Sequence, residues 1–260
     1  MNVMIIGIPK EIKTQEHRVA LLPSAAYQLI KHGHKVVVET QAGADIGFCD
    51  QNYRDAGAEI VQEHAEVFEQ ANMIVKVKEP LPSEYSLLRK DHTLFTYLHL
   101  AANRPLTEAL MKTGATCIAY ETVSVNHRLP LLEPMSEIAG RMSVQVGAHY
   151  LEKEQGGRGI LLGGVPGVAP ARVAILGGGV SGLNAAQMAV GLRADVTIYD
   201  ISNDRLAELD THFGNSIKTA YASKSAIAAA VANAHLVIGA VLVPGAAAPK
   251  LVTREMLKTM

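Results

Sequence analysis

The stretch that most constrains this chain covers residues 171–200, ARVAILGGGVSGLNAAQMAVGLRADVTIYD. The apolar run at 173–176 predicts a buried parallel strand, and the run at 196–199, which ends in Asp200, predicts a second one. Between the two runs lie a glycine-rich turn and an alanine-rich helical stretch. The glycines of the turn, Gly177, Gly179 and Gly182, have G-x-G-x-x-G spacing. With an acid about 20 residues further on, this pattern is the fingerprint of a dinucleotide-binding βαβ unit.

Each position of the fingerprint has a physical role. Gly177 permits the tight turn, Gly179 lets the backbone approach a pyrophosphate, and Gly182 allows the helix to pack closely on the strand. The helix that starts near Val180 offers unpaired N–H groups and a partial positive charge to that pyrophosphate. Asp200 would accept hydrogen bonds from ribose hydroxyls and repel a 2′-phosphate, which favours NAD over NADP. The alternative is an ordinary glycine turn, with Asp200 capping the following helix.

Composition narrows the class of protein. The chain has 260 residues, of which 48% are hydrophobic and 19% charged, and this is typical of a globular protein of one or two domains. The net charge of −1 gives no reason to expect nucleic acid or an anionic membrane as a partner. The N-terminus does not resemble a signal peptide, and no apolar run approaches the roughly 20 residues that span a bilayer. Cys49 and Cys117 fit no metal spacing and are expected to be reduced, so we expect a cytoplasmic protein without a metal site.

Strand-like and helix-like patterns alternate along the chain, which predicts an α/β fold with two parallel, doubly wound sheets. The pattern breaks at residues 126–134, and we place a domain boundary there. The expected domains are a substrate domain at 1–130 and a Rossmann-type NAD-binding domain at 131–260, entered through a long connecting helix at about 136–154. The second domain shows only four strands where such a domain usually has six, so we expect it to be incomplete.

The connecting helix carries an apolar face. Ser136 is placed to cap it, and the apolar side chains follow at helical spacing: Ile138, Met142, Val146 and Tyr150. This face is larger than a simple linker needs, so we expect an oligomer. Burial of the same face within the chain is the alternative.

Three residues of the first half lie at or just after the carboxyl ends of predicted strands, where ligands bind in open α/β sheets. Arg18 lies after the first strand, Lys78 closes the strand predicted at 73–78, and His99 follows the strand predicted at 93–97. A guanidinium binds a carboxylate, an ammonium polarises a carbonyl oxygen, and an imidazole transfers a proton near neutral pH. Together they suit a small carboxylate with a reactive carbonyl. The alternatives are solvated charges for Arg18 and Lys78 and a buried core histidine for His99.

Seven stretches of the chain form a pattern that is more specific together than any one of them: 7–11 (GIPKE), 16–20 (EHRVA), 76–80 (KVKEP), 97–102 (YLHLAA), 135–141 (MSEIAGR), 177–182 (GGGVSG) and 239–245 (GAVLVPG). In these stretches the chain resembles the bacterial alanine dehydrogenase family, and the resemblance runs almost from end to end. This family is related to the alpha subunit of proton-translocating transhydrogenase.

The resemblance implies a function. It implies that Arg18 and Lys78 hold pyruvate or alanine, that Lys78 and His99 are catalytic, and that His99 is the acid/base. It places Ser136, Val180, Asp200, Ser223, Val241 and Leu242 around the cofactor, together with the fingerprint glycines. The implied reaction is the reversible conversion of L-alanine, NAD⁺ and water to pyruvate, ammonium and NADH in amino-acid catabolism, by a homohexamer. The alternative is a transhydrogenase-type domain that binds NAD(H) without alanine turnover, although such domains generally lack the histidine.

Members of this family continue for about another hundred residues, with an Asp-Gln-Gly-Gly stretch that carries a catalytic aspartate and an Asn-Met stretch at the nicotinamide. These stretches are not in the sequence. From the resemblance, we expect a chain of these 260 residues to be less active and less stable than a longer family member.

Overall fold

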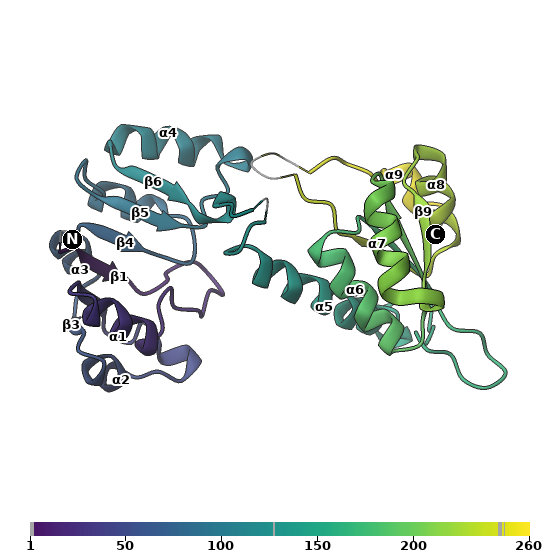
Figure 1. The fold of residues 1–260 in the computed structure, drawn as a ribbon, viewed down its shortest axis with the longest axis horizontal. Helices are drawn as coiled ribbons and strands as arrows, with labels where there is room; N and C mark the ends of the chain where they lie inside the picture. Colours follow the sequence, from purple (N-terminus) through teal and green to yellow (C-terminus); the bar gives the residue numbers. More distant parts are fainter. Residues whose placement is uncertain (1–2, 127, 244–245, 247) are drawn as a thin grey trace. The chain divides into compact units, whose positions relative to one another are not determined.

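The structure is a computed structural model that describes residues 3–126, 128–243, 246 and 248–260. The chain forms two compact units, Met1–Val125 and Asn126–Met260 (Figure 1). The boundary predicted at residue 130 lies close to this division. Each unit is an α/β structure with a parallel sheet, and the predicted fold class is confirmed. Pro244 and Gly245, which end the last of the seven family-like stretches, lie outside the described residues.

Unit 1 contains a parallel sheet of six strands in the order β3-β2-β1-β4-β5-β6. The strands are β1 (Ile5–Ile8), β2 (Lys35–Glu39), β3 (Glu59–Val61), β4 (Met73–Val75), β5 (Thr93–Thr96) and β6 (Thr116–Ala119). Ile6 pairs with Val36 of β2 on one side and with Met73 of β4 on the other. The direction of winding therefore reverses between β1 and β4, and in such sheets this point is where ligands bind.

Helices cover both faces of this sheet, as the alternating strand and helix patterns predict. One face packs α1 (Pro23–Lys31) and α2 (Asp50–Asp55) through side chains such as Ala26 and Tyr53. The other packs α3 (His64–Gln70) and α4 (Arg104–Thr113) through Phe68, Leu106 and Leu110. Four short 3₁₀ segments complete the described part of this unit: Ala44–Ile46, Pro82–Leu87, Leu100–Ala102 and Tyr120–Thr122.

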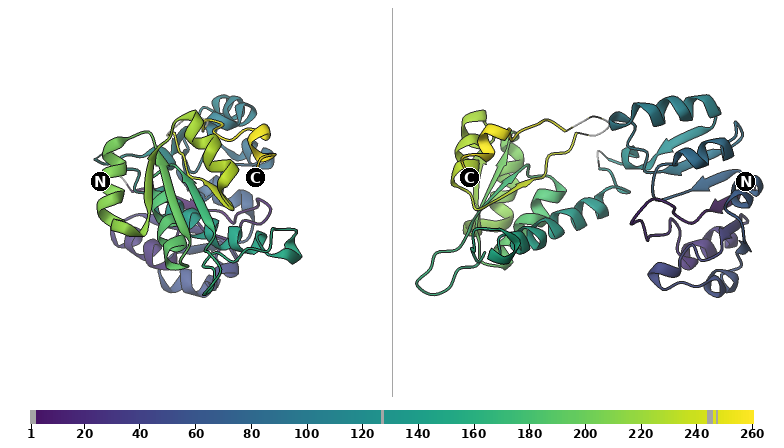
Figure 2. Two further views of the ribbon diagram at one scale, coloured as in Figure 1. Left: turned by 90° about the vertical axis from the view of Figure 1, so that its right-hand side faces the viewer. Right: turned by 180° about the vertical axis from the view of Figure 1, so that it is seen from behind.

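Unit 2 contains a parallel sheet of four strands in the order β10-β7-β8-β9. They are β7 (Arg172–Leu176), β8 (Asp195–Asp200), β9 (Lys218–Tyr221) and β10 (Leu236–Gly239), and the predicted number of strands is confirmed. Helices α5 (Glu133–Tyr150), α6 (Val180–Gly191) and α7 (Asn203–Phe213) cover one face of the sheet. Helices α8 (Lys224–Asn233) and α9 (Arg254–Leu257) cover the other face (Figures 1 and 2). The winding reverses between β7 and β10.

The long helix differs from its prediction at both ends. It spans Glu133–Tyr150, with a proline in its first turn, so Ser136 lies inside the helix and does not cap it. The helix packs against α6 so closely that a Cβ on Gly140 would lie 2.2 Å from the carbonyl oxygen of Ser181. Its predicted apolar face is largely exposed within unit 2. In the part of the chain that the structure describes, no helix is both long enough and apolar enough to cross a membrane.

The strand predicted at 73–78 is also shorter than expected, because β4 ends at Val75. The backbone N–H of Lys76 still donates to the carbonyl oxygen of Phe95 at 3.1 Å. The next two N–H groups, of Val77 and Lys78, donate instead to the carboxylate of Glu11, at 2.6 and 3.3 Å. A side-chain acceptor thus replaces the neighbouring strand, and Lys78 lies in the loop beyond the sheet.

Candidate functional site

Unit 2 has a cavity of about 580 Å³ at the carboxyl ends of its strands. It lies where the winding reverses, because both the turn after β7 and the segment after β10 line it. Its volume falls in the usual range of small-molecule and cofactor sites. Seven of the residues predicted to contact the cofactor line it: Ser136, Gly177, Gly179, Val180, Asp200, Val241 and Leu242.

The three fingerprint glycines meet different constraints. Gly177 has φ of 104°, which a residue with a Cβ rarely adopts. A Cβ on Gly182 would lie 1.9 Å from the carbonyl oxygen of Gly177, so helix α6 needs a glycine there to pack on the turn. A Cβ on Gly179 would meet no described atom within 4 Å. Packing therefore does not explain Gly179, and the open space beside it fits the close approach of a pyrophosphate. The start of α6 also has no side-chain cap, which leaves its N–H groups for an anion.

Asp200 ends β8 and holds the fingerprint turn in place. One carboxylate oxygen accepts the N–H of Gly178 at 2.7 Å, and the other accepts the N–H of Ser202 at 2.9 Å. The cap of the next helix is Ser202, whose hydroxyl accepts the N–H of Arg205 at 3.2 Å, so Asp200 is not the cap. A carboxylate has about four acceptor positions, so Asp200 keeps acceptor capacity for ribose hydroxyls while it faces the cavity.

Two predicted cofactor residues do not line this cavity. Gly182 packs beneath the turn, and Ser223 caps helix α8 by accepting the N–H of Ala226 at 3.1 Å. The neighbours of Ser223, Ala222 and Ile227, do line the cavity. A direct cofactor contact of Ser223 stays a prediction.

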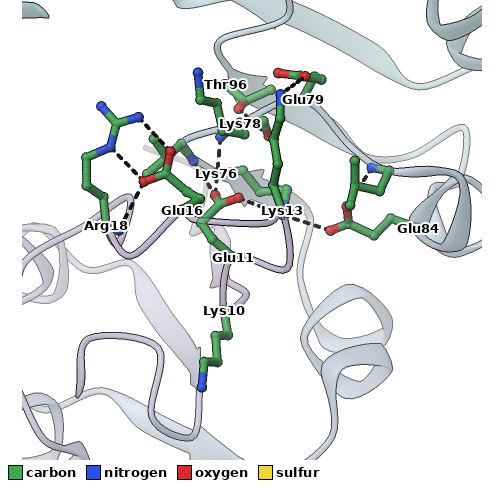
Figure 3. Close-up of polar contacts among 12 residues, drawn as sticks. Lys10, Glu11, Lys13, Glu16, Arg18, Lys76, Lys78, Glu79, Glu84 and Thr96 are labelled. Carbon is green, nitrogen blue, oxygen red and sulfur yellow. Dashed lines mark hydrogen bonds and ion pairs between the residues drawn. The ribbon is translucent and has the colours of Figure 1, made fainter. Parts of the chain in front are cut away.

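Arg18 lies in the loop after β1, where Glu16 fixes its guanidinium. Nε and Nη2 of Arg18 donate to the two oxygens of Glu16 at 2.7 and 2.6 Å (Figure 3). Hydrogen bonding from Arg18 lowers the pKa of Glu16 against the effect of burial, and the nearby charge of Lys78 contributes. The loop after β1 therefore presents an oriented guanidinium, and Lys78 lies close to it.

Lys78 lies in the loop after β4, and both of its backbone polar groups are held. Its N–H donates to Glu11, and its carbonyl oxygen accepts the hydroxyl of Thr96 from β5 at 2.9 Å (Figure 3). Among the residues that the structure describes, no carboxylate lies within ion-pair distance of its ammonium group. A fixed backbone, and an ammonium that pairs with no carboxylate in the described part of the chain, suit a residue that binds an anionic ligand.

His99 lies in the turn that follows β5 and has a left-handed backbone, with φ of 52° and ψ of 36°. Its side chain is 49% exposed, so the alternative of a buried core histidine is wrong. Nδ1 lies 3.6 Å from a carboxylate oxygen of Glu79, whose other oxygen pairs with Lys13. Glu79 therefore links the loops after β1, β4 and β5, and these loops carry Arg18, Lys78 and His99.

Beneath this edge lies a buried set of charges that the sequence analysis missed. The ammonium of Lys76 lies 2.8 Å from Glu84 and 3.4 Å from Glu11, and all three side chains are almost fully buried (Figure 3). His64 joins Glu84 to Glu39, with contacts of 3.2 and 2.7 Å. A lysine in the apolar run at 73–77 was the available signal, since a charge is rarely buried unless it is paired. Burial raises the pKa of Glu11, although the charge of Lys76 opposes this shift.

His64 makes the stability of unit 1 depend on pH. Burial alone lowers its pKa, but hydrogen bonds to Glu39 and Glu84 outweigh burial and raise the pKa to about 9. Because the folded pKa exceeds the unfolded one, this stabilisation is complete below about pH 6.5 and is lost as the pH rises through about 9. We expect the loss to be on the order of 3 kcal/mol.

Urea unfolding of the protein and of His64→Gln across this pH range measures the effect. The substitution should make the free energy of unfolding depend less steeply on pH. As a control, His32→Gln changes an exposed histidine whose ring bonds the carbonyl oxygen of Gln28 in α1, and this variant should keep the pH dependence of the unsubstituted protein. If the free energy of unfolding has the same slope against pH in the unsubstituted protein and in His64→Gln, the prediction is contradicted.

Comparison with known proteins gives a consistent result. Residues 7–139 match the family model of the alanine dehydrogenase/PNT N-terminal domain, and residues 143–260 match that of the C-terminal domain. The chain is 59% identical to alanine dehydrogenase of Bacillus subtilis, and the match covers 99% of this chain and 68% of that protein. It is 55% identical to alanine dehydrogenase of Methanococcus maripaludis, covering 99% of this chain and 69% of that protein.

Solved structures agree with these matches. An L-alanine dehydrogenase superposes with a TM-score of 0.90 at 58% identity, covering 99% of this chain and 71% of that one. A transhydrogenase from Sinorhizobium meliloti superposes with a TM-score of 0.80 at 29% identity, covering 98% of this chain and 75% of that one.

Proposed function

The chain belongs to the alanine dehydrogenase/PNT family, and we propose that it is an NAD-dependent alanine dehydrogenase. The reversible reaction converts L-alanine, NAD⁺ and water to pyruvate, ammonium, NADH and a proton. The observation that carries this proposal is the 59% identity to an alanine dehydrogenase over 99% of the chain. Amino-acid catabolism is the process that this reaction would serve.

In this proposal unit 1 binds the substrate. Arg18, oriented by Glu16, pairs with the substrate carboxylate, and Lys78 donates to the carbonyl oxygen of pyruvate. The positive charge of Lys78 stabilises negative charge that develops on this oxygen as ammonia adds to the carbonyl carbon. The fixed backbones of both loops limit the freedom of the substrate before reaction.

His99 transfers protons in this proposal. As a base it removes a proton from the water that attacks the imine carbon, and as an acid it protonates the oxygen that leaves in the reverse direction. The carboxylate of Glu79 lies 3.6 Å from Nδ1, so Nε2 is the ring nitrogen that can contact the substrate. The exposed ring of His99 gives the substrate access to it.

Unit 2 holds the cofactor, and its residues fit NAD. The bound cofactor would supply the acceptor for the hydride that leaves the α-carbon of alanine. The start of α6 and the open space at Gly179 would receive its pyrophosphate, and Asp200 would accept hydrogen bonds from a ribose. The carboxylate of Asp200 also disfavours the 2′-phosphate of NADP.

The absorbance of NADH tests the function directly. The protein should consume NADH when pyruvate and ammonium are both present, and it should bind NADH without them. The second candidate is a transhydrogenase-type domain, which the likeness to the Sinorhizobium meliloti structure favours. In a protein that also carries the family's Asp-Gln-Gly-Gly and Asn-Met stretches, intact NADH binding with no turnover of pyruvate or alanine would support that candidate and contradict the first.

Asp200→Ala is expected to narrow the preference for NADH over NADPH. Losing hydrogen bonds to a charged group costs about 1.5–3 kcal/mol, so NADH should bind roughly 10- to 100-fold more weakly. The affinity for NADPH should fall less, because the substitution also removes the repulsion between Asp200 and the 2′-phosphate. Fluorescence titration with each nucleotide measures both affinities.

Asp204→Ala is the control, since Asp204 is an exposed acid in the first turn of α7 and does not line the cavity. It should leave both affinities unchanged. Equal affinities of the unsubstituted protein for NADH and NADPH would show that Asp200 does not select the cofactor.

We also propose a cytoplasmic homo-oligomer, and a homohexamer by the family resemblance. The apolar side chains that α5 exposes within unit 2 support the assembly: Ile138, Met142, Val146 and Tyr150. Cys49 and Cys117 are free thiols, which suits a reducing compartment. A monomer mass in light scattering would contradict the assembly.

A further inference from the structure

The turn at the end of β5 puts His99 in a conformation that needs support. Its φ of 52° lies in the left-handed region, which residues with a Cβ seldom occupy. Such backbone persists where surrounding contacts hold it, and it is frequent at functional sites. The contacts that hold this turn therefore determine where the imidazole lies.

One carboxylate accepts two consecutive backbone N–H groups, those of Leu98 and His99. The N–H of Leu98 lies 3.1 and 3.2 Å from the two oxygens of Glu121, and the N–H of His99 lies 2.8 Å from one of them. Consecutive N–H groups that converge on one acceptor form an anion-binding concavity, and here the anion is a side chain of the protein itself. Glu121 thus fixes the orientation of the backbone at His99.

Glu121 reaches this turn from the neighbouring strand. It lies in the 3₁₀ segment Tyr120–Thr122, directly after β6, and Thr96 of β5 pairs with Ala119 of β6. The adjacent Tyr120 packs its ring edge-on against Tyr97 at 4.4 Å and donates its hydroxyl to the carbonyl oxygen of Lys76 at 2.7 Å. The segment after β6 therefore holds the loops after both β4 and β5.

We propose that Glu121 is a positioning residue for His99. The carboxylate holds the turn so that the imidazole lies beside Glu79 and faces the substrate. Glu79 contacts the ring of His99, whereas Glu121 contacts the backbone and so acts through His99. This inference rests on the acid/base role given to His99 in the proposed function.

Glu121→Gln tests the proposal with little change of shape. A glutamine offers one acceptor oxygen in place of two, and its amide N–H₂ group faces the backbone donors. We expect kcat to fall about 10-fold or more, because small displacements of a catalytic group cost up to about 100-fold. The KM for pyruvate should stay within about twofold, since Arg18 and Lys78 bind the substrate. Glu121→Asp, which keeps the charge but withdraws the oxygens, should show a smaller loss.

Two further measurements separate positioning from a general loss of structure. In a His99→Gln background, Glu121→Gln should lower kcat no further, because its effect passes through His99. The amide proton signals of Leu98 and His99 in NMR spectra should move upfield in Glu121→Gln, because their bonds to a charged acceptor are weakened. Glu108→Gln is the matched control, since Glu108 pairs with Arg104 on the exposed face of α4 and should change none of these readouts.

The outcomes are distinct. Moved amide signals with an unchanged kcat would overturn the proposal, and so would an equal fractional loss of kcat with and without His99. If His99→Gln itself keeps the original kcat, the acid/base role fails and the positioning role fails with it. In that case the amide signals still show whether Glu121 holds the turn, so the two failures can be told apart.

Discussion

His99→Gln is expected to lower kcat for pyruvate reduction by about 10²–10⁴-fold, the usual contribution of a general acid/base. Glutamine keeps a polar side chain but does not transfer protons, so proton transfer to and from the oxygen that adds to or leaves the imine carbon is lost, while the turn after β5 is retained. Affinity for NADH should stay the same, because the residues that line the cofactor cavity all belong to unit 2. Stopped-flow absorbance for turnover and fluorescence titration for NADH measure the two quantities on the same preparation.

His32→Gln is the matched control for this experiment. His32 is an exposed histidine at the end of α1, and its substitution should leave kcat unchanged. A His99→Gln protein that keeps its kcat would contradict the acid/base role. Loss of NADH binding in the same variant would also contradict it, since a change at the turn would then act beyond proton transfer.

Lys76→Met is expected to destabilise the protein by about 3–5 kcal/mol, the usual cost of breaking a buried ion pair by removing one partner. The Lys76 side chain is 1% exposed and has two carboxylate partners, Glu11 and Glu84. Methionine fills a similar volume, so the cost comes from two buried carboxylates that lose their cation and not from a cavity. Urea unfolding followed by far-UV circular dichroism measures the change.

The pH dependence of Lys76→Met gives an independent check. Burial already raises the pKa of Glu11, and without Lys76 that pKa should rise further. An acid whose folded pKa exceeds its unfolded pKa favours folding when it is protonated. The loss of unfolding free energy in Lys76→Met should therefore become smaller as the pH falls toward the pKa of Glu11.

Lys78→Met is the matched control, because this half-buried lysine has no carboxylate partner among the described residues. Its loss should affect substrate binding far more than the free energy of unfolding. Equal stabilities of Lys76→Met and Lys78→Met would contradict the role of the buried pair.

Local sequence patterns predicted much of the fold. The strands around the fingerprint, the helix between them and the four-stranded sheet of unit 2 follow from apolar periodicity and from glycine spacing, and the structure shows each of them. The same holds for the positions of Arg18 and His99 beyond strand ends, because a strand that ends places the next residues at an edge of its sheet. Lys78, predicted as the last residue of a strand, lies instead in the loop beyond β4. The positions of the strands and helices, and the residues that follow each strand, depend on residues that are close together in the chain.

Tertiary structure alone decided which charged residues meet. Lys76 and Lys78 lie two positions apart in one predicted strand, yet Lys76 is buried between Glu11 and Glu84. Lys78 lies at the sheet edge, where no carboxylate of the described residues pairs with it. Their difference depends on Glu11, which enters from the loop after β1 because β1 and β4 are neighbours at the reversal of winding. Likewise, Glu121 contacts the turn at His99 because β6 pairs with β5. The sequence thus determined the elements and the ends of the strands where the candidate residues lie. The pairing of strands determined the contacts between them, since local periodicity contains no information about which strand ends come together.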